Sequence, residues 1–252
     1  MSKLSRILIT IFISLTVFNC KSQNLILNGS FENYTNPLDC GNGGFYNQYY
    51  YPAPHVLDNW EEYNSCDYFT TYCPHYPGQL GFEIPASWFG YSPTKNGNAY
   101  VGFGPYTNGN EYKEYLYQHL SNPLQAGKVY CLSFYVTRAD RGTFAIENID
   151  AYFTATLPTL ISNMYISASP QVLNQNGIIS DTTQWTNIQG CFTAVGGEQY
   201  MIIGNFNSNA NTDSLMVGTN NPIPNMPSGY AYYFIDDITL IDQMTVGVKH
   251  RW

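Results

Sequence analysis

The chain has little charge. Only 11% of its 252 residues are Asp, Glu, Lys or Arg, whereas an ordinary globular domain carries roughly 25%. Disordered proteins combine low hydrophobicity with high net charge, and a content of 44% hydrophobic residues excludes that class. A coiled coil would draw about half of its residues from Ala, Glu, Lys, Leu and Arg, and this composition does not. The chain is therefore expected to fold around a packed core.

Basic residues are especially scarce, with 10 Lys and Arg against 18 Asp and Glu. Proteins that bind nucleic acids need a footprint of Lys and Arg on the phosphate backbone. The sequence therefore predicts no nucleic-acid partner.

Catalytic signatures are also missing. The sequence contains no G-x-S-x-G, no H-E-x-x-H and no phosphate-binding loop. A glycosidase needs two carboxylates that face each other across a cleft, but Glu147 and Asp150 are three residues apart and a strand would send them to opposite faces. We therefore predict a protein that is not an enzyme, with a glycoside hydrolase as the residual alternative.

Long apolar runs are absent, so no transmembrane segment is predicted. The apolar stretch Ile7–Phe18 follows Lys3 and Arg6 and precedes the small residues Cys20 and Ser22. This order is typical of a signal peptide. Residues 1–22 are therefore predicted to be cleaved off, which places the protein outside the cell or on the outer cell surface.

A lipid anchor is the alternative for the N-terminus. In a lipoprotein-type cut, Cys20 would become the lipidated first residue, although Asn19 before it fits such a site poorly. Simple cleavage removes three basic residues and leaves seven against 18 acidic ones, so the net charge falls from −8 to −11. This charge disfavours anionic partners.

Aromatic residues are abundant, at 16% of the chain with 23 Tyr. Strand-like runs recur between segments rich in Gly, Asn, Pro and Ser, which is typical of an antiparallel β-sandwich or jelly roll. The predicted strands are Leu25–Leu27, Ala99–Phe103, Tyr115–Leu120, Val129–Thr137, Phe144–Thr154, Trp185–Ala194, Tyr200–Phe206 and Tyr232–Ile241. We predict an all-β fold with one β-sandwich domain over residues 23–242, an irregular Cys-, Tyr- and Pro-rich insertion at about 33–93, and a tail at 243–252.

The cysteines suggest disulfides, which export permits. Alternation in KVYCLSFYV and WTNIQGCFTA places Cys131 and Cys191 on the more polar face of their strands, as a cross-strand bridge requires. Cys73 is expected to pair with Cys40 or with Cys66 and so to staple the N-terminal region. A zinc site is disfavoured because the spacing lacks paired C-x-x-C units.

A polar and aromatic strand face is the candidate binding surface. If the strands concerned share one sheet, alternation places Tyr and Trp beside amides and a carboxylate. Sugars need this mixture, because rings pack on their C–H faces and polar groups bond their hydroxyls. The predicted ligand-binding residues are Tyr135, Asn148, Asp150, Tyr152, Trp185, Asn187 and Gln189. The alternative is that these are ordinary strand-forming residues at a surface.

A carboxylate on an apolar strand face is the candidate metal ligand. In YYFIDDITLI, alternation places Asp236 on one face with Phe234, Ile238 and Leu240. A buried carboxylate needs a partner, and calcium accepts carboxylate and carbonyl oxygens. The alternatives are a β-bulge that turns Asp236 and Asp237 to solvent, or an ion pair with Arg138 or Arg141.

Six motifs over residues 24–242 carry a family resemblance. In order they are NLILNGSFENY, CDYF at Cys66–Phe69, NGNAYVGFG, PLQAGKVYCLSFYV, WTNIQGCFTAVGGEQYMIIGNF and YYFIDDITLI. Their succession resembles secreted surface proteins of Bacteroidetes-type bacteria with galactose-binding-like jelly-roll modules. These are similar to carbohydrate-binding modules of the family 4/9/22 type.

The resemblance implies two packed antiparallel sheets and a non-catalytic module that binds polysaccharide or cell-surface glycan. A structural or adhesive surface protein of the same fold is the alternative. The resemblance also implies a structural calcium ion that ties the first strand to the last. The matching ligand positions are the Ser30 carbonyl, Glu32, Asp236 and Asp237.

Overall fold

The computed structural model describes residues 23–34, 40, 57–73, 81–161, 165–218 and 229–243. The predicted signal peptide with Cys20, and most of the predicted tail, lie outside these ranges. Within them, no helical segment has the length and apolar character needed to cross a bilayer.

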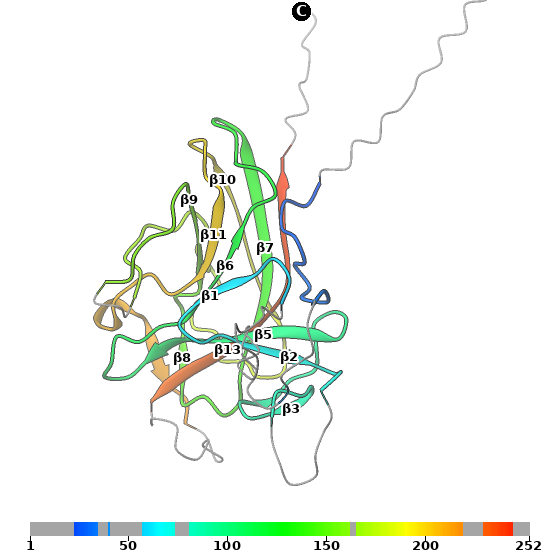
Figure 1. The fold of residues 1–252 in the computed structure, drawn as a ribbon. Helices are drawn as coiled ribbons and strands as arrows, with labels where there is room; N and C mark the ends of the chain where they lie inside the picture. The colour runs from blue at the N-terminus through cyan, green and yellow to red at the C-terminus, as the bar shows by residue number, and fades with distance from the viewer. Residues whose placement is uncertain are drawn as a thin grey trace, which may run out of the picture.

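Five antiparallel strands form the larger sheet, in the order β10-β7-β13-β5-β2. They are β2 (Asp67–Thr70), β5 (Ala99–Thr107), β7 (Val129–Arg138), β10 (Thr186–Thr193) and β13 (Tyr230–Asp242). β13 lies at the centre and pairs with β5 over its first half and with β7 along most of its length. Figure 1 shows β13 bending sharply between these two stretches.

The second sheet has the order β1-β6-β11-β9. Its strands are β1 (Glu61–Tyr63), β6 (Tyr115–His119), β9 (Asp150–Thr154) and β11 (Tyr200–Gly204). Two short pairs complete the strands: β3 (Ala86–Ser87) with β4 (Gly90–Tyr91), and β8 (Phe144–Ile146) with β12 (Ser214–Met216). A single turn of 3-10 helix, η1, spans Asn209–Asn211.

The core lies between the two sheets. On β7, Tyr130, Leu132, Phe134 and Val136 are buried while the residues between them are partly exposed. They belong to the same buried cluster as Leu116, Phe153, Met201 and Ile203 of the four-stranded sheet. The predicted all-β antiparallel sandwich is confirmed, because the period-two alternation along these strands supplies both inner faces.

A second aromatic cluster covers the outer face of the five-stranded sheet. It comprises Phe69, Phe82, Phe89, Tyr100, Ala139, Tyr230, Tyr232 and Phe234. Phe82 and Phe89 come from the segment around β3 and β4, which therefore packs on β2, β5 and β13. This segment belongs to the insertion predicted to be irregular at 33–93. That prediction is wrong in part, because β1 and β2 from the same insertion extend the two main sheets.

A β-bulge interrupts β13 after Asp236, and Asp237 takes a φ of 56°. Before the bulge, Tyr233 and Ile235 face the main core; after it, Ile238 and Leu240 do so. The prediction that Asp236 shares a face with Ile238 and Leu240 is therefore wrong. The bulge inserts a residue and reverses the alternation, but Asp236 is fully buried rather than turned to solvent.

Two of the predicted disulfides form. Cys131 and Cys191 are opposite each other in the β7–β10 register, with Cα atoms 4.0 Å apart. Cys40 pairs with Cys73. Cys66 is a free, buried thiol, so the pairing of Cys66 with Cys73 is excluded.

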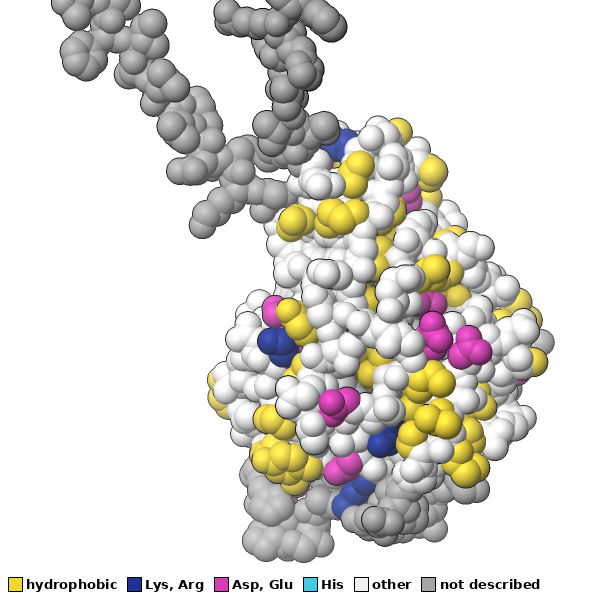
Figure 2. All heavy atoms as spheres, turned by 180° about the vertical axis from the view of Figure 1, so that it is seen from behind, with side chains coloured by type: hydrophobic (Ala, Val, Ile, Leu, Met, Phe, Trp, Pro, Cys, Tyr) yellow, Lys and Arg dark blue, Asp and Glu magenta, His cyan; other side chains and the backbone are white. Residues whose placement is uncertain are grey.

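The predicted first strand Leu25–Leu27 is not a strand, but its segment does lie along the last one. Leu25 N–H donates to the Leu240 carbonyl at 2.8 Å, and Asn24 forms a β-bridge with Ile241. Figure 1 shows this blue segment beside the red end of β13. Figure 2, the opposite face, shows mainly uncharged polar surface with scattered acidic and basic side chains and separate hydrophobic patches.

Candidate functional site

The seven residues of the predicted sugar-binding face do not share one sheet. Tyr135, Asn187 and Gln189 lie on β7 and β10 of the larger sheet, and Trp185 directly precedes β10. Asp150 and Tyr152 lie on β9 of the smaller sheet, with Asn148 just before it. The condition on which that face was predicted is therefore not met, and only the first group remains together.

Neighbouring segments contact that first group. The Trp185 indole N–H donates to the Pro93 carbonyl at 3.2 Å, and Lys95 Nζ lies 4.4 Å from the centre of the Tyr135 ring. In the second group, the buried carboxylate of Asp150 accepts the Asn174 N–H at 2.9 Å. Burial raises the pKa of Asp150 to about 6. This carboxylate holds a backbone turn and is turned away from solvent.

Two of the four predicted calcium ligands, Glu32 and Asp236, hold a loop. Asp236 Oδ2 accepts the N–H groups of Lys95 and Asn96 at 3.1 and 3.0 Å. Glu32 Oε1 accepts those of Asn98 and Ala99 at 2.6 and 3.0 Å. The two carboxylates thus hold residues 95–99 between the N-terminal segment and β13.

A calcium ion would share these oxygens with N–H donors. Asp236 Oδ1 also accepts the Asp237 N–H at 2.6 Å, and burial raises the pKa of Asp236 to about 7. Among the described residues, no three His, Cys, Asp or Glu side chains are grouped as a metal site. The calcium site stays a prediction. A fall of several degrees in melting temperature on chelation with EDTA would support it, and an unchanged value would contradict it.

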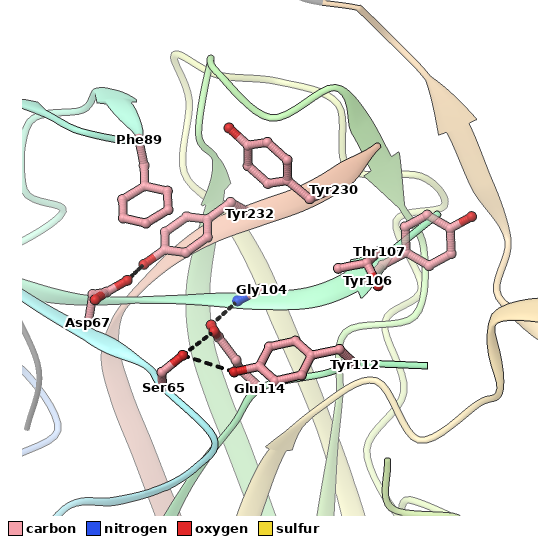
Figure 3. Close-up of a pocket in the computed structure, with 10 residues that line it drawn as sticks. All are labelled: Ser65, Asp67, Phe89, Gly104, Tyr106, Thr107, Tyr112, Glu114, Tyr230 and Tyr232. Atoms are coloured by element: carbon pink, nitrogen blue, oxygen red, sulfur yellow. Dashed lines mark hydrogen bonds between the residues drawn. The ribbon is translucent and has the colours of Figure 1, made fainter. Parts of the chain in front are cut away.

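A cavity of about 330 Å³ opens on the outer side of the five-stranded sheet, and we call it the tyrosine pocket. Figure 3 shows the side chains that converge on it from β2, β5, β13 and the neighbouring loops. It is lined by Ser65, Asp67, Phe89, Gly104, Tyr106, Thr107, Tyr112, Glu114, Tyr230 and Tyr232. Five aromatic residues, two carboxyl groups and two aliphatic hydroxyl groups therefore line one small space.

Hydrogen bonds position the polar group at one wall of the pocket. Glu114 Oε2 accepts the Gly104 N–H of β5 at 2.6 Å, and its Oε1 accepts the Ser65 hydroxyl at 2.9 Å. Ser65 Oγ also lies 2.9 Å from the Tyr112 hydroxyl. Figure 3 shows this chain of contacts running from the strand to Tyr112. The Tyr112 ring is therefore held over the cavity while remaining partly exposed.

The aromatic wall rests on a stacked pair. The rings of Phe89 and Tyr232 are 3.7 Å apart between centroids and 10° from parallel. The Tyr232 hydroxyl donates to Asp67 Oδ2. Because Phe89 comes from the segment that covers the sheet, that segment completes the pocket as well as the second aromatic cluster.

Burial raises the pKa values of the acids in this region. Burial raises the pKa of Asp67 to about 7, against the lowering effect of the hydrogen bond from Tyr232. Burial and the neighbouring Asp67 raise the pKa of Glu114 well above its usual value. The same two causes raise the pKa of Glu62, adjacent to the pocket, to about 8. Loss of water and mutual repulsion both disfavour the charged forms.

No basic side chain of the described residues neutralises Asp67 or Glu114. All five contact other groups. Lys95 lies over Tyr135, Lys113 bonds Asn209, Lys128 bonds Asp242, Arg138 bonds backbone carbonyls, and Arg141 bonds the Trp88 carbonyl near the pocket rim. Among the described residues, the pocket lining therefore holds acids that no basic side chain bonds, although Lys113 Nζ lies 5.7 Å from the centre of the Tyr106 ring.

Sequence reasoning missed this pocket because its lining comes from separate stretches of the chain. Glu114 belongs to Glu111–His119, the most charged stretch of the sequence, and Asp67 to the CDYF motif. The charged stretch and the motif can both be seen in the sequence. The pairing of β2 with β5 and of β5 with β13 brings Asp67 and Glu114 together, and alternation within single strands does not predict that pairing.

A second, more open groove of about 680 Å³ lies on the outer face of the four-stranded sheet. Its lining includes Glu61, Tyr117, His119, Leu157 and Tyr200. The rings of His119 and Tyr200 meet edge to face at 5.0 Å. This groove is shallow, and its walls carry fewer rings than the tyrosine pocket.

Comparisons with known proteins give a likeness of fold. No protein-family model matches the chain, and no curated protein matches it. Solved structures do match. The K3 cleaved adhesin domain of Lys-gingipain from Porphyromonas gingivalis is 16% identical, with a TM-score of 0.41 over 87% of this chain and 98% of that one.

Two further structures show the range of the likeness. The CBM22-1 xylan-binding domain of Xyn10C from Paenibacillus barcinonensis is 11% identical, with a TM-score of 0.38 over 75% of this chain and 88% of that one. The Stig cyclase Fisc from Fischerella is 10% identical, with a TM-score of 0.44 over 88% and 98%. A binding domain, an adhesin domain and a cyclase thus appear together. Similarity this weak assigns neither a family nor residue roles to this chain.

Proposed function

We propose that this chain is an exported, non-catalytic module that binds glycan in the tyrosine pocket. The observation that carries the proposal is the pocket itself, where the partly exposed Tyr112 and the stacked Phe89–Tyr232 pair surround the carboxyl groups of Asp67 and Glu114. Ring faces pack on the C–H side of a sugar, and carboxyl oxygens bond its hydroxyls. The pocket volume, about 330 Å³, is at the lower end of the range for ligand sites.

The pocket is better supported than the face predicted from sequence, because its rings and polar groups converge. The groups at Tyr135 and Trp185 are already contacted by Lys95 and Pro93. The two disulfides support export, since such bonds persist in oxidising compartments. The ligand class expected from the pocket alone is one or a few sugar units at a chain end or branch, since the cavity is small.

A glycan array probed with the full chain tests the proposal. We expect Tyr112→Ala to weaken binding of any captured glycan about 10-fold, because an aromatic stacking contact contributes about 0.5 to 1.5 kcal/mol beyond the area that it buries. Tyr91→Ala is the matched control, since Tyr91 is 59% exposed and lies outside the pocket lining. We expect this control to bind as the parent does.

Three results would redirect the proposal. Unchanged binding by Tyr112→Ala with loss in Tyr135→Ala or Trp185→Ala would place the ligand on the sequence-predicted face. Loss only in Tyr117→Ala or Tyr200→Ala would place it in the open groove. No glycan binding at all would favour the structural or adhesive alternative of the same fold.

Acid–base catalysis is the second candidate function. Two neighbouring carboxyl groups with raised pKa values are what a catalytic acid and base require. Release of reducing sugar from a panel of glycosides, abolished by both Asp67→Asn and Glu114→Gln, would establish hydrolysis. We expect no turnover.

A further inference from the structure

We propose that the ligand of the tyrosine pocket carries an ammonium group, and that the glycan it takes is an amino sugar with a free amine. This inference rests on the proposed glycan-binding function and names the chemical class that the pocket selects. Three independent features lead to it: the ring walls, the unpaired carboxyl groups and the distribution of basic residues.

The walls attract cations. Aromatic faces carry negative electrostatic potential, and cages of Tyr and Trp bind organic ammonium ions. Here Tyr112, Tyr230 and Tyr232 with Phe89 line the space, whereas the Tyr106 ring is already contacted by Lys113. Stacking fixes Tyr232, and a hydrogen bond to Ser65 restrains Tyr112. A ligand cation would therefore meet ring faces that are already ordered, which limits the entropy lost on binding.

The carboxyl groups lack a counter-ion. Asp67 is bonded by a neutral phenol, and Glu114 by a neutral hydroxyl and a backbone N–H. A buried carboxylate becomes favourable only when it is paired. An ammonium group would supply that charge and donate hydrogen bonds to the same oxygens.

Adjacent to the pocket, Glu62 adds to this imbalance. Its Oε2 atom is buried and has no hydrogen-bond partner among the described residues. The Asp67 carboxyl group disfavours ionisation of Glu62 and so raises its pKa. Arg141 bonds backbone beside Phe89, and Lys113 bonds Asn209. An ammonium group on a ligand would supply the positive charge that these acids do not receive from the described residues.

A metal ion is the competing occupant. Calcium prefers six to eight oxygen ligands, whereas this lining supplies two carboxyl groups among five aromatic side chains. An organic cation makes use of both kinds of wall. An amino sugar adds a pyranose ring, which the partly exposed Tyr112 can stack against.

Isothermal titration of the full chain at neutral pH and low salt tests the inference. The probes are fully deacetylated chitosan oligosaccharides, chitin oligosaccharides of the same length, cello-oligosaccharides, choline and calcium chloride. We expect the deacetylated oligomer to bind about 10-fold tighter than its acetylated counterpart, since a desolvated cation–π contact and a charge-assisted bond together reach that size.

Charge-neutralising variants assign the preference to the pocket. We expect Asp67→Asn and Glu114→Gln each to reduce the preference for the deacetylated oligomer over the acetylated one toward unity. Asp213→Asn removes the same charge from an exposed residue outside the pocket lining and should keep the preference. Using two pocket variants guards against the failure of one of them to fold.

The outcomes separate this inference from the proposed function. Equal or tighter binding of acetylated or neutral oligomers overturns the ammonium preference and leaves glycan binding standing. Choline binding without any sugar binding supports the cation site and overturns the glycan function. If the protein binds calcium but no amine, and Glu114→Gln abolishes the calcium binding, the inference is overturned in favour of a metal site. A preference that survives in both pocket variants also overturns it, and no binding of any probe overturns both.

Discussion

Single acids in this protein show how burial decides the state of a side chain. Glu62, Asp67 and Glu114 come from an acidic, sparsely charged sequence, yet burial raises the pKa of each. Carboxylates elsewhere are satisfied differently: Asp181, near the surface, accepts two backbone N–H groups and a hydroxyl, which lower its pKa. Composition predicts neither outcome, because the neighbours come from distant parts of the chain.

The buried acids predict a stability that falls as pH rises. A carboxyl group whose pKa is raised on folding binds its proton more tightly in the native state. Its contribution is complete below the unfolded value of about 4.5 and is lost as pH rises through the folded value, about 8 for Glu62. We expect the melting temperature of the ligand-free protein to fall between pH 5 and pH 8.

Glu62→Gln is the variant that checks this origin. At pH 8 this substitution should raise the unfolding free energy by on the order of 1 kcal/mol or more, and the melting temperature should rise with it. At pH 5 it should change both quantities little. Thermal melts across this pH range measure both effects. Asp213→Asn is the control, and the same gain in that variant would show that net charge alone is responsible.

At the scale of elements, alternation predicted the strands well and failed where an extra residue entered. Cys131 and Cys191 were placed correctly because β7 and β10 are regular and pair in register. Asp236 was placed incorrectly because the bulge at Asp237 reverses the alternation of β13. The continuous strand predicted at Phe144–Thr154 divides into β8 and β9, which lie in different sheets. Pattern alone does not show such breaks.

The loop held by Asp236 provides an element-scale prediction. Asp236→Ala would leave the N–H groups of Lys95, Asn96 and Asp237 without their acceptor. We expect a loss of about 2 to 4 kcal/mol in unfolding free energy, since unsatisfied buried donors are costly. Chemical denaturation measures it. Asp236→Asn keeps one acceptor oxygen and should lose less; an equal loss in both variants would mean that the charge, and not the acceptor, matters.

At the scale of the whole molecule, the described fold consists of two packed sheets, an aromatic segment that covers one of them, and two disulfides. The overall class could be predicted from sequence because seven of the eight predicted strand segments contain strands in the structure. The tyrosine pocket could not, because it depends on how Phe89 and the Glu111–His119 stretch reach the same face of the larger sheet. Tertiary arrangement, rather than local pattern, creates that site.

The disulfide between the neighbouring strands β7 and β10 gives a prediction at this scale. Replacing both Cys131 and Cys191 by Ala opens a loop with a sequence separation of 60 residues. We expect the unfolding free energy to fall by about 2 to 4 kcal/mol, mainly because the unfolded chain gains freedom. Denaturant titration measures the change. An unaltered midpoint would show that the pairing of β7 with β10 suffices without the bond.

The two described ends of the chain lie side by side, and this fixes where the tyrosine pocket lies relative to them. Asn24 bridges to Ile241 at one end of β13, whereas Tyr230 and Tyr232 line the pocket near its other end. Figure 1 shows both described ends leaving the sandwich from the same pole. The tyrosine pocket and the two described ends are therefore separated by the length of β13.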